Sequence, residues 1–145
     1  MSCVYLIATD KLLPLCNFQE MRTKIVVYGD TRYTISATQG FQISEHDYYR
    51  YAVDELHVTM KPHQYELSLE ADESDLLHLK DYLLENFSTG EDVELWNLWV
   101  GVDRDDRVLR YRGELSDFDV ESLKRFLESN LENGKFSQIQ MTITI

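Results

Sequence analysis

Histidine and cysteine are the side chains of this chain best suited to bind a metal or act as a nucleophile. His46, His57, His63 and His78 lie in four separate predicted elements. None forms the i, i+4 pair or the Cys-x-x-Cys partnership typical of a zinc site. Cys3 lies in an apolar segment, where burial raises the pKa of a thiol and so opposes its activation. These patterns predict no metal site and no catalytic residue.

Phosphate-binding and calcium-binding motifs are also missing or incomplete. The chain has no Gly-x-Ser-x-Gly, no Gly-x-Gly-x-x-Gly and no Gly-Lys-Ser/Thr sequence. Asp103, Asp105 and Glu114 match positions 1, 3 and 12 of a calcium loop, but Arg107 and Val108 occupy positions that need an oxygen ligand and a glycine. A solvated turn between two strands explains these acids better, and no cofactor is predicted.

Aromatic residues form two groups that could anchor a partner. Trp96 and Trp99 point to opposite faces of one predicted strand, and Tyr48, Tyr49 and Tyr51 lie close together in the sequence. Such side chains often anchor interfaces, because one end can be buried while the other hydrogen-bonds. Packing between the N-terminal part and the sheet is the alternative explanation of both groups.

The net charge is −12 and is unevenly distributed. Residues 1–65 contain seven acidic and six basic side chains, whereas residues 66–145 contain nineteen acidic and eight basic ones. The negative electrostatic field of residues 66–145 repels nucleic acid and anionic lipid, and it attracts a basic protein. Ordinary solubility is the alternative reason for such a charge. We therefore expect no nucleic-acid or membrane partner. The predicted partner is a basic protein, bound through Trp96 or Trp99 with Asp103, Asp105 and Asp106.

A second hypothesis is a small-molecule site between the N-terminal segment and the sheet. His46, Tyr48, Tyr49 and His57 could supply acid-base groups there.

Residues 1–61 form a predicted β-rich extension. Residues 3–8 are β-branched and aromatic, which indicates a strand. Gly29-Asp30 separates two β-prone runs, 25–28 and 31–37, and predicts a hairpin. A short helix capped by Ser44 is expected to follow.

Residues 62–145 show a clearer pattern of alternating strands and helices. Strands are predicted over 65–69, 93–100, 107–113 and 139–145, the last with one wet face. One helix is predicted from Asp72 to Phe87, and a second from a Ser116 cap to Asn133-Gly134.

This order is βαββαβ, so the predicted fold class is α+β with a ferredoxin-like unit over about 64–145. In that topology the strand carrying Trp96 and Trp99 lies at an edge, although it is apolar on both faces. The conflict disappears if the hairpin-containing extension completes the sheet. The chain is therefore expected to be a single domain over 1–145, which agrees with its length.

Several segments resemble an uncharacterised family of small bacterial cytosolic proteins. These proteins open with Met-Cys-x-Tyr-Ile-Ala-Ser-Asp-Lys-Pro-Leu-Pro and later carry Val-Glu-Leu-Tyr-x-x-Trp. The counterparts here lie at residues 3–14, at Lys61-Pro62 and at residues 93–99. A Gly-Cys-Gly-Cys-Gly-Phe segment of the relatives is replaced by Ser68-Leu69-Glu70-Ala71, so their thiol chemistry does not carry over. The resemblance implies a bacterial cytoplasmic origin and supplies no activity.

The function predicted from these observations is that of a non-catalytic, acidic, protein-binding protein of the cytoplasm, either immunity-like or regulatory. A small-molecule binder or small enzyme is the alternative. The start of the chain lacks the basic segment of a signal peptide, no apolar run is long enough for a membrane span, and both cysteines are expected to be free thiols. The oligomeric state stays open.

Overall fold

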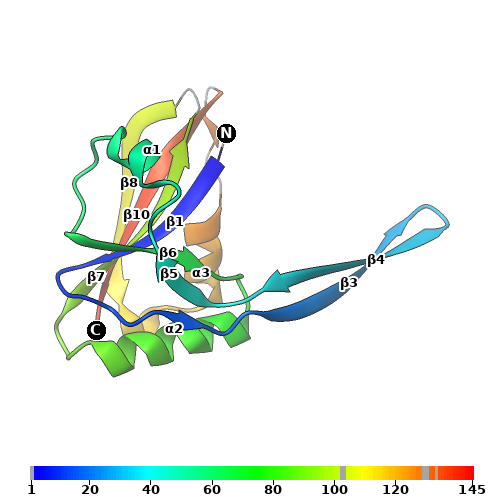
Figure 1. The fold of residues 1–145 in the computed structure, drawn as a ribbon, viewed down its shortest axis with the longest axis horizontal. Helices are drawn as coiled ribbons and strands as arrows, with labels where there is room; N and C mark the ends of the chain where they lie inside the picture. The colour runs from blue at the N-terminus through cyan, green and yellow to red at the C-terminus, as the bar shows by residue number, and fades with distance from the viewer. Residues whose placement is uncertain (1, 102–103, 129–130, 133) are drawn as a thin grey trace.

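A large mixed sheet forms the centre of the molecule (Figure 1). The computed structural model describes residues 2–101, 104–128, 131–132 and 134–145. Within these residues the sheet order is β2-β5-β6-β1-β7-β10-β8, with β9 beside β10. The strands of this sheet are β1 (Ser2–Thr9), β2 (Cys16–Asn17), β5 (Gln42–Glu45), β6 (His63–Ser68), β7 (Asp92–Val100), β8 (Arg104–Glu114), β9 (Leu131–Glu132) and β10 (Lys135–Thr144). A separate hairpin contains β3 (Glu20–Tyr28) and β4 (Thr31–Gln39).

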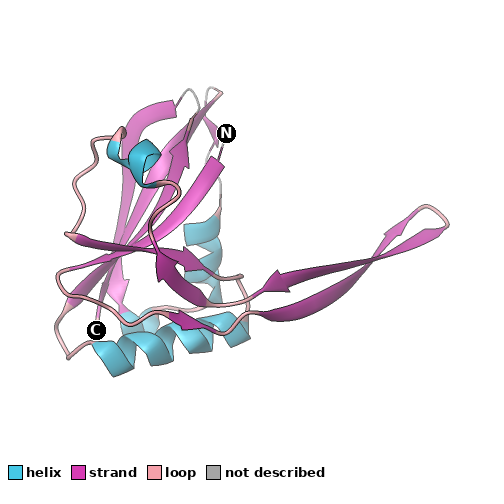
Figure 2. Cartoon of the chain, viewed as in Figure 1, coloured by secondary structure: helices cyan, strands magenta, loops and turns pink. Residues whose placement is uncertain are grey.

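Helices cover both faces of the sheet (Figure 2). This agrees with β7, where consecutive residues point to opposite faces and are buried on both. Val93 and Leu95 pack in the cluster that contains α2 (Glu73–Asn86) and α3 (Val120–Leu127). Trp96, Leu98 and Val100 pack in the cluster that contains Val53 of α1 (Arg50–Asp54). The two-sided apolar pattern of β7 is thereby explained.

The mixed α+β class is confirmed, but the ferredoxin-like unit is not. Strand β1 lies between β6 and β7 and pairs antiparallel with both, so the four predicted strands are not an uninterrupted sheet. Strand β8 pairs in parallel with β10. Strand β7 would lie at an edge of the ferredoxin-like unit, but here it is flanked by β10 and by β1, so a strand of the N-terminal extension does pair with it.

The N-terminal extension completes the sheet only in part. Strands β1, β2 and β5 join it, whereas the predicted hairpin forms correctly but pairs only with itself. Gly29 adopts φ 62° in its turn, a conformation that glycine reaches without strain.

Several local predictions are corrected. Ser44 belongs to β5 and caps no helix, since α1 begins at Arg50 after Tyr49. Helix α3 ends at Leu127, before the predicted end at Asn133-Gly134. Asp119, and not Ser116, caps α3, because its carboxylate accepts from the Ser122 amide in a capping box; residues Leu115–Asp117 form a 3-10 turn. Strand β10 has no wet face, because residues 137–143 are all buried and their side chains alternate between the two faces of the sheet. Gln138 is buried there and bonds both the amide and the carbonyl of Trp99.

Candidate functional site

The β3–β4 hairpin extends away from the rest of the molecule (Figures 1 and 2). Its strands pair in register from Glu20 opposite Gln39 to Tyr28 opposite Thr31. Nine extended residues span about 30 Å at the usual rise per residue. The hairpin is therefore an arm, and its distal part has the geometry to reach another molecule.

Both faces of this arm carry exposed apolar side chains. The register places Ile25 and Val27 on one face, and Val26 with its partner Tyr33 on the other. Ile25 is 67% exposed and Tyr28 is 80% exposed. The full set of large exposed apolar residues on the arm is Met21, Ile25, Val26, Val27, Tyr28, Tyr33 and Ile35. Exposed apolar side chains concentrated on one element in this way are typical of a protein–protein interaction site.

Arg22 fixes the base of the arm to the start of α2. Its guanidinium donates to Asp72 at 2.9 Å and to the fully buried Asp75 at 2.8 Å. Asp75 also accepts from the Glu70 amide at 2.6 Å, and Asp72 caps the helix by accepting from the Asp75 amide. The hydrogen bond to Asp75 and the negative charges of Asp75, Asp72 and Glu20 raise the pKa of Arg22, although burial opposes the shift, so the guanidinium stays charged. The arm thus has a rigid attachment and an exposed distal end.

A cavity of about 190 Å³ opens between β1 and β6. Its lining includes Cys3, Tyr49 and Glu66. Burial raises the pKa of the Cys3 thiol, as expected, and its Sγ donates to Asn97 Oδ1 at 3.0 Å. A thiol held in this way is a poor nucleophile.

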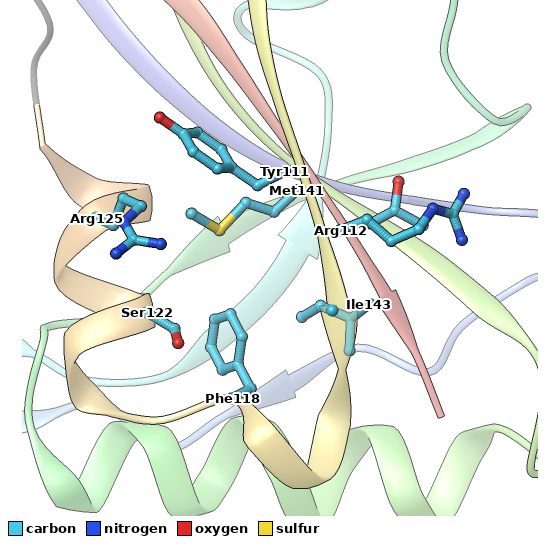
Figure 3. A pocket seen from close by; sticks show the side chains of 9 residues that line it. Tyr111, Arg112, Phe118, Ser122, Arg125, Met141 and Ile143 are labelled. Carbon is cyan, nitrogen blue, oxygen red and sulfur yellow. The ribbon is translucent and has the colours of Figure 1, made fainter.

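A small cavity of about 80 Å³ lies between α3, β8 and β10 (Figure 3). Tyr111 and Met141 point toward α3 in this view, and Arg112 points to the other side of β8. The guanidinium of Arg125 lies 5.7 Å from the centre of the Tyr111 ring, so its charge makes a cation–π contact within the protein. This cavity is too small to hold more than a few atoms.

A third cavity, of about 350 Å³, lies between the β2 segment and the end of α2. It contains Cys16, whose pKa is raised by burial and by the nearby Glu85 carboxylate. Tyr82, also in its wall, donates to the Pro14 carbonyl at 2.7 Å. His78 stacks on Phe18 with ring centres 4.4 Å apart. These contacts are structural, and they do not pair the thiol with a base.

The predicted partner-binding residues are not assembled into one exposed site. Trp96 is fully buried in the α1-side core, so its side chain is not exposed to a partner, and packing is the role that the structure gives it. Trp99 is half-buried and stacks on Phe136 with ring centres 3.9 Å apart. Asp103 lies outside the described residues, and Asp105 and Asp106 belong to β8.

The predicted small-molecule residues are only partly brought together. Tyr49 lines the β1–β6 cavity, and Tyr48 packs edge-on against it but is 87% exposed. His46 is fully buried with neither ring nitrogen hydrogen-bonded. His57 is exposed just after α1, with φ 55°.

Sequence reasoning missed Glu66 and the exposed arm. Glu66 lies on the wet face of a correctly predicted strand, and nothing in its local sequence distinguishes it from a solvated acid. The run Ile25-Val26-Val27-Tyr28 did carry a signal, since four consecutive apolar residues leave a hairpin with no polar face.

Two classes of site are not found in the described part of the chain. No group of three or more His, Cys, Asp or Glu side chains there could hold a metal ion. Over the same residues, no helix has the length and apolar character needed to cross a bilayer.

Comparison with protein-family models, with curated proteins and with solved structures finds no match to this chain. The resemblance of residues 3–14 and 93–99 to a bacterial family stays a prediction. The geometry described above is what supports a functional proposal.

Proposed function

We propose that this protein is a non-catalytic binding protein that engages a basic protein through its β3–β4 arm. The observation that carries the proposal is the exposure of apolar residues on both faces of an arm that projects from the molecule. Burying such residues is worth roughly 25 cal/mol per Å² of apolar surface, so a partner with a cleft for the arm gains affinity. The immunity-like or regulatory role belongs to this proposal.

The charge of the molecule supports a basic partner. The net charge is −12, whereas the arm itself carries three basic and two acidic side chains: Arg22, Lys24, Arg32, Glu20 and Asp30. The rest of the molecule thus supplies the negative field that attracts the partner, and the arm supplies the apolar contact. Two copies of this chain repel each other through the same field, which disfavours self-association.

Site-specific crosslinking tests the proposal. A photoreactive phenylalanine analogue replaces Tyr28 on the arm or, as a matched control, Tyr48. The two side chains are similarly exposed, 80% for Tyr28 and 87% for Tyr48. We expect irradiation in the native cells to crosslink the Tyr28 position to one basic protein and the Tyr48 position to none. Equal crosslinking at both positions would count against the arm.

Binding measurements with the purified protein and its crosslinked partner then distinguish a specific complex from non-specific apolar association. Ile25→Asp with Val27→Asp should weaken binding at least tenfold, because each change buries a charge in the interface. Leu84→Asp is the control, since Leu84 is an exposed apolar residue of α2, 62% exposed against 67% for Ile25. Association should slow as salt is added. A complex formed only between copies of this chain, or one unaffected by the arm variant, overturns the proposal.

A further inference from the structure

Strand β1 is paired along only half of its β6 side. It pairs with β7 from Ser2 to Ala8, but with β6 only from Leu6 to Thr9. Continuing the register beyond Leu6 opposite Glu66 would join Tyr5 to Leu67 and Val4 to Ser68, yet these pairs are not formed. The two strands therefore separate inside the sheet, while each keeps its other neighbour.

The cavity of about 190 Å³ lies at this separation. It is lined by Cys3, Val4, Tyr5, Gln42, Ser44, Tyr49, Glu66, Leu67 and Ser68. The stretches of β1 and β6 that leave the ladder border it, so their backbone groups are available to a ligand. Gln42, Ser44 and Ser68 add amide and hydroxyl groups from β5 and β6.

Glu66 supplies the only carboxylate among the lining residues. Its Oε1 atom is buried and has no hydrogen-bond partner. An unpaired buried carboxylate oxygen is costly, and a cation beside it removes that cost. The lining residues Cys3 and Tyr5 do not compete for it, because the Cys3 thiol bonds Asn97 and the Tyr5 hydroxyl bonds the Leu127 carbonyl.

We propose that this cavity binds a small primary amine, with the ammonium group on Glu66 and the remainder along the separated backbone edges of β1 and β6. A single carboxylate matches a single positive charge, and the hydroxyl and amide groups suit a ligand that also carries an amide. The site is independent of the arm, so it adds a ligand to the proposed protein-binding role.

A titration followed by ¹H–¹⁵N NMR tests this site, with glycinamide as the probe. Acetamide is the matched compound, because it keeps the amide and lacks the ammonium group. We expect saturable shifts of the Ser44, Tyr49 and Glu66 amides with glycinamide and none with acetamide. Equal shifts with both compounds, or none with glycinamide, would overturn the proposal.

Two variants assign the binding to Glu66. Glu66→Gln keeps the shape of the side chain and removes its charge, so glycinamide should bind at least tenfold more weakly. Glu45→Gln removes one charge from the exposed end of the neighbouring β5 and should bind as the unaltered protein does. Dispersed spectra of both variants establish that they are folded. Unchanged binding in Glu66→Gln, or equal weakening in Glu45→Gln, contradicts the assignment.

Discussion

Glu66 links the ligand proposal to the stability of the free protein. Burial, and to a smaller extent the nearby Asp47, raises the pKa of its carboxyl group. The unfolded chain loses this proton near the ordinary pKa of about 4.3, whereas the folded protein retains it to higher pH. Between these two pKa values the folded state binds more protons, so stability falls as pH rises.

We expect Glu66→Gln to stabilise the free protein at neutral pH and to have little effect below about pH 4, where both forms are uncharged. Urea unfolding of both proteins across this range measures the difference. A stability difference that is the same at acidic and neutral pH would show that the carboxylate is not destabilised by its surroundings.

His46 has the opposite pH dependence. Burial lowers the pKa of its imidazole, and the nearby Arg50 guanidinium lowers it further, while Asp54 and Asp47 oppose the shift. The unfolded chain therefore takes up a proton near pH 6.5 that the folded protein still rejects. Stability is complete above this pH and is lost as the pH falls below it.

Replacing His46 by Phe should remove this acid sensitivity. The substitution also removes two ring nitrogens that are buried without a partner, so we expect a gain of about 1 kcal/mol in the free energy of unfolding at pH 7. Thermal unfolding between pH 5 and pH 8 tests both effects. A loss of stability at pH 7 would show that the nitrogens have partners in solution.

At the scale of elements, the sequence predicted what depends on local signals. Asp72 caps α2 and Gly29-Asp30 turns the hairpin, because a side-chain acceptor and a positive φ act within a few residues. The start of α3 was misplaced because both Ser116 and Asp119 can cap, and only the bonds to Ser122 decide between them. The candidate sites were harder to predict, since Glu66 and Tyr49 meet Cys3 only through sheet pairing.

Arg22 connects two elements, and its removal should be costly. Arg22→Ala leaves the buried Asp75 carboxylate with only the Glu70 amide, so we expect a loss of about 3 kcal/mol. Lys24→Ala, on the same face of β3 but exposed, is the control and should change stability by less than about 0.5 kcal/mol. Urea unfolding measures both. Equal losses in the two variants would show that the contact with α2 contributes nothing.

At the scale of the whole molecule, strand order could not be predicted from the sequence. The pattern of β7 required a cover on both faces, and that requirement was correct. Which strands become its neighbours depends on contacts between distant residues, such as Cys3 opposite Trp99 and Ile139 opposite Asn97. Periodicity within one strand carries no information about such pairs.

The distal arm should be dispensable for the fold. Lys24 and Ile35 face each other four pairs from the turn and so have the same kind of pairing as Tyr28 and Thr31, which flank the native two-residue turn. Residues 25–34 can therefore be replaced by Asn-Gly without changing the register. We expect the free energy of unfolding to change by less than about 1 kcal/mol, because the removed residues are exposed. Circular dichroism during thermal unfolding checks this, and a large loss would show that the arm stabilises the sheet.

The position of β1 between β6 and β7 has a consequence for synthesis on the ribosome. Strand β1 is made long before β7, and its ladder with β7 can be complete only after Val100 has left the exit tunnel. Until β6 and β7 have emerged in turn, the apolar side chains of Val4, Leu6 and Ile7 have no partner strand. Pairing strands so distant in sequence is slow, since a long loop must close first. The nascent chain therefore exposes this apolar segment until β6 emerges, and the ladder between β1 and β7 forms only after β7 has emerged.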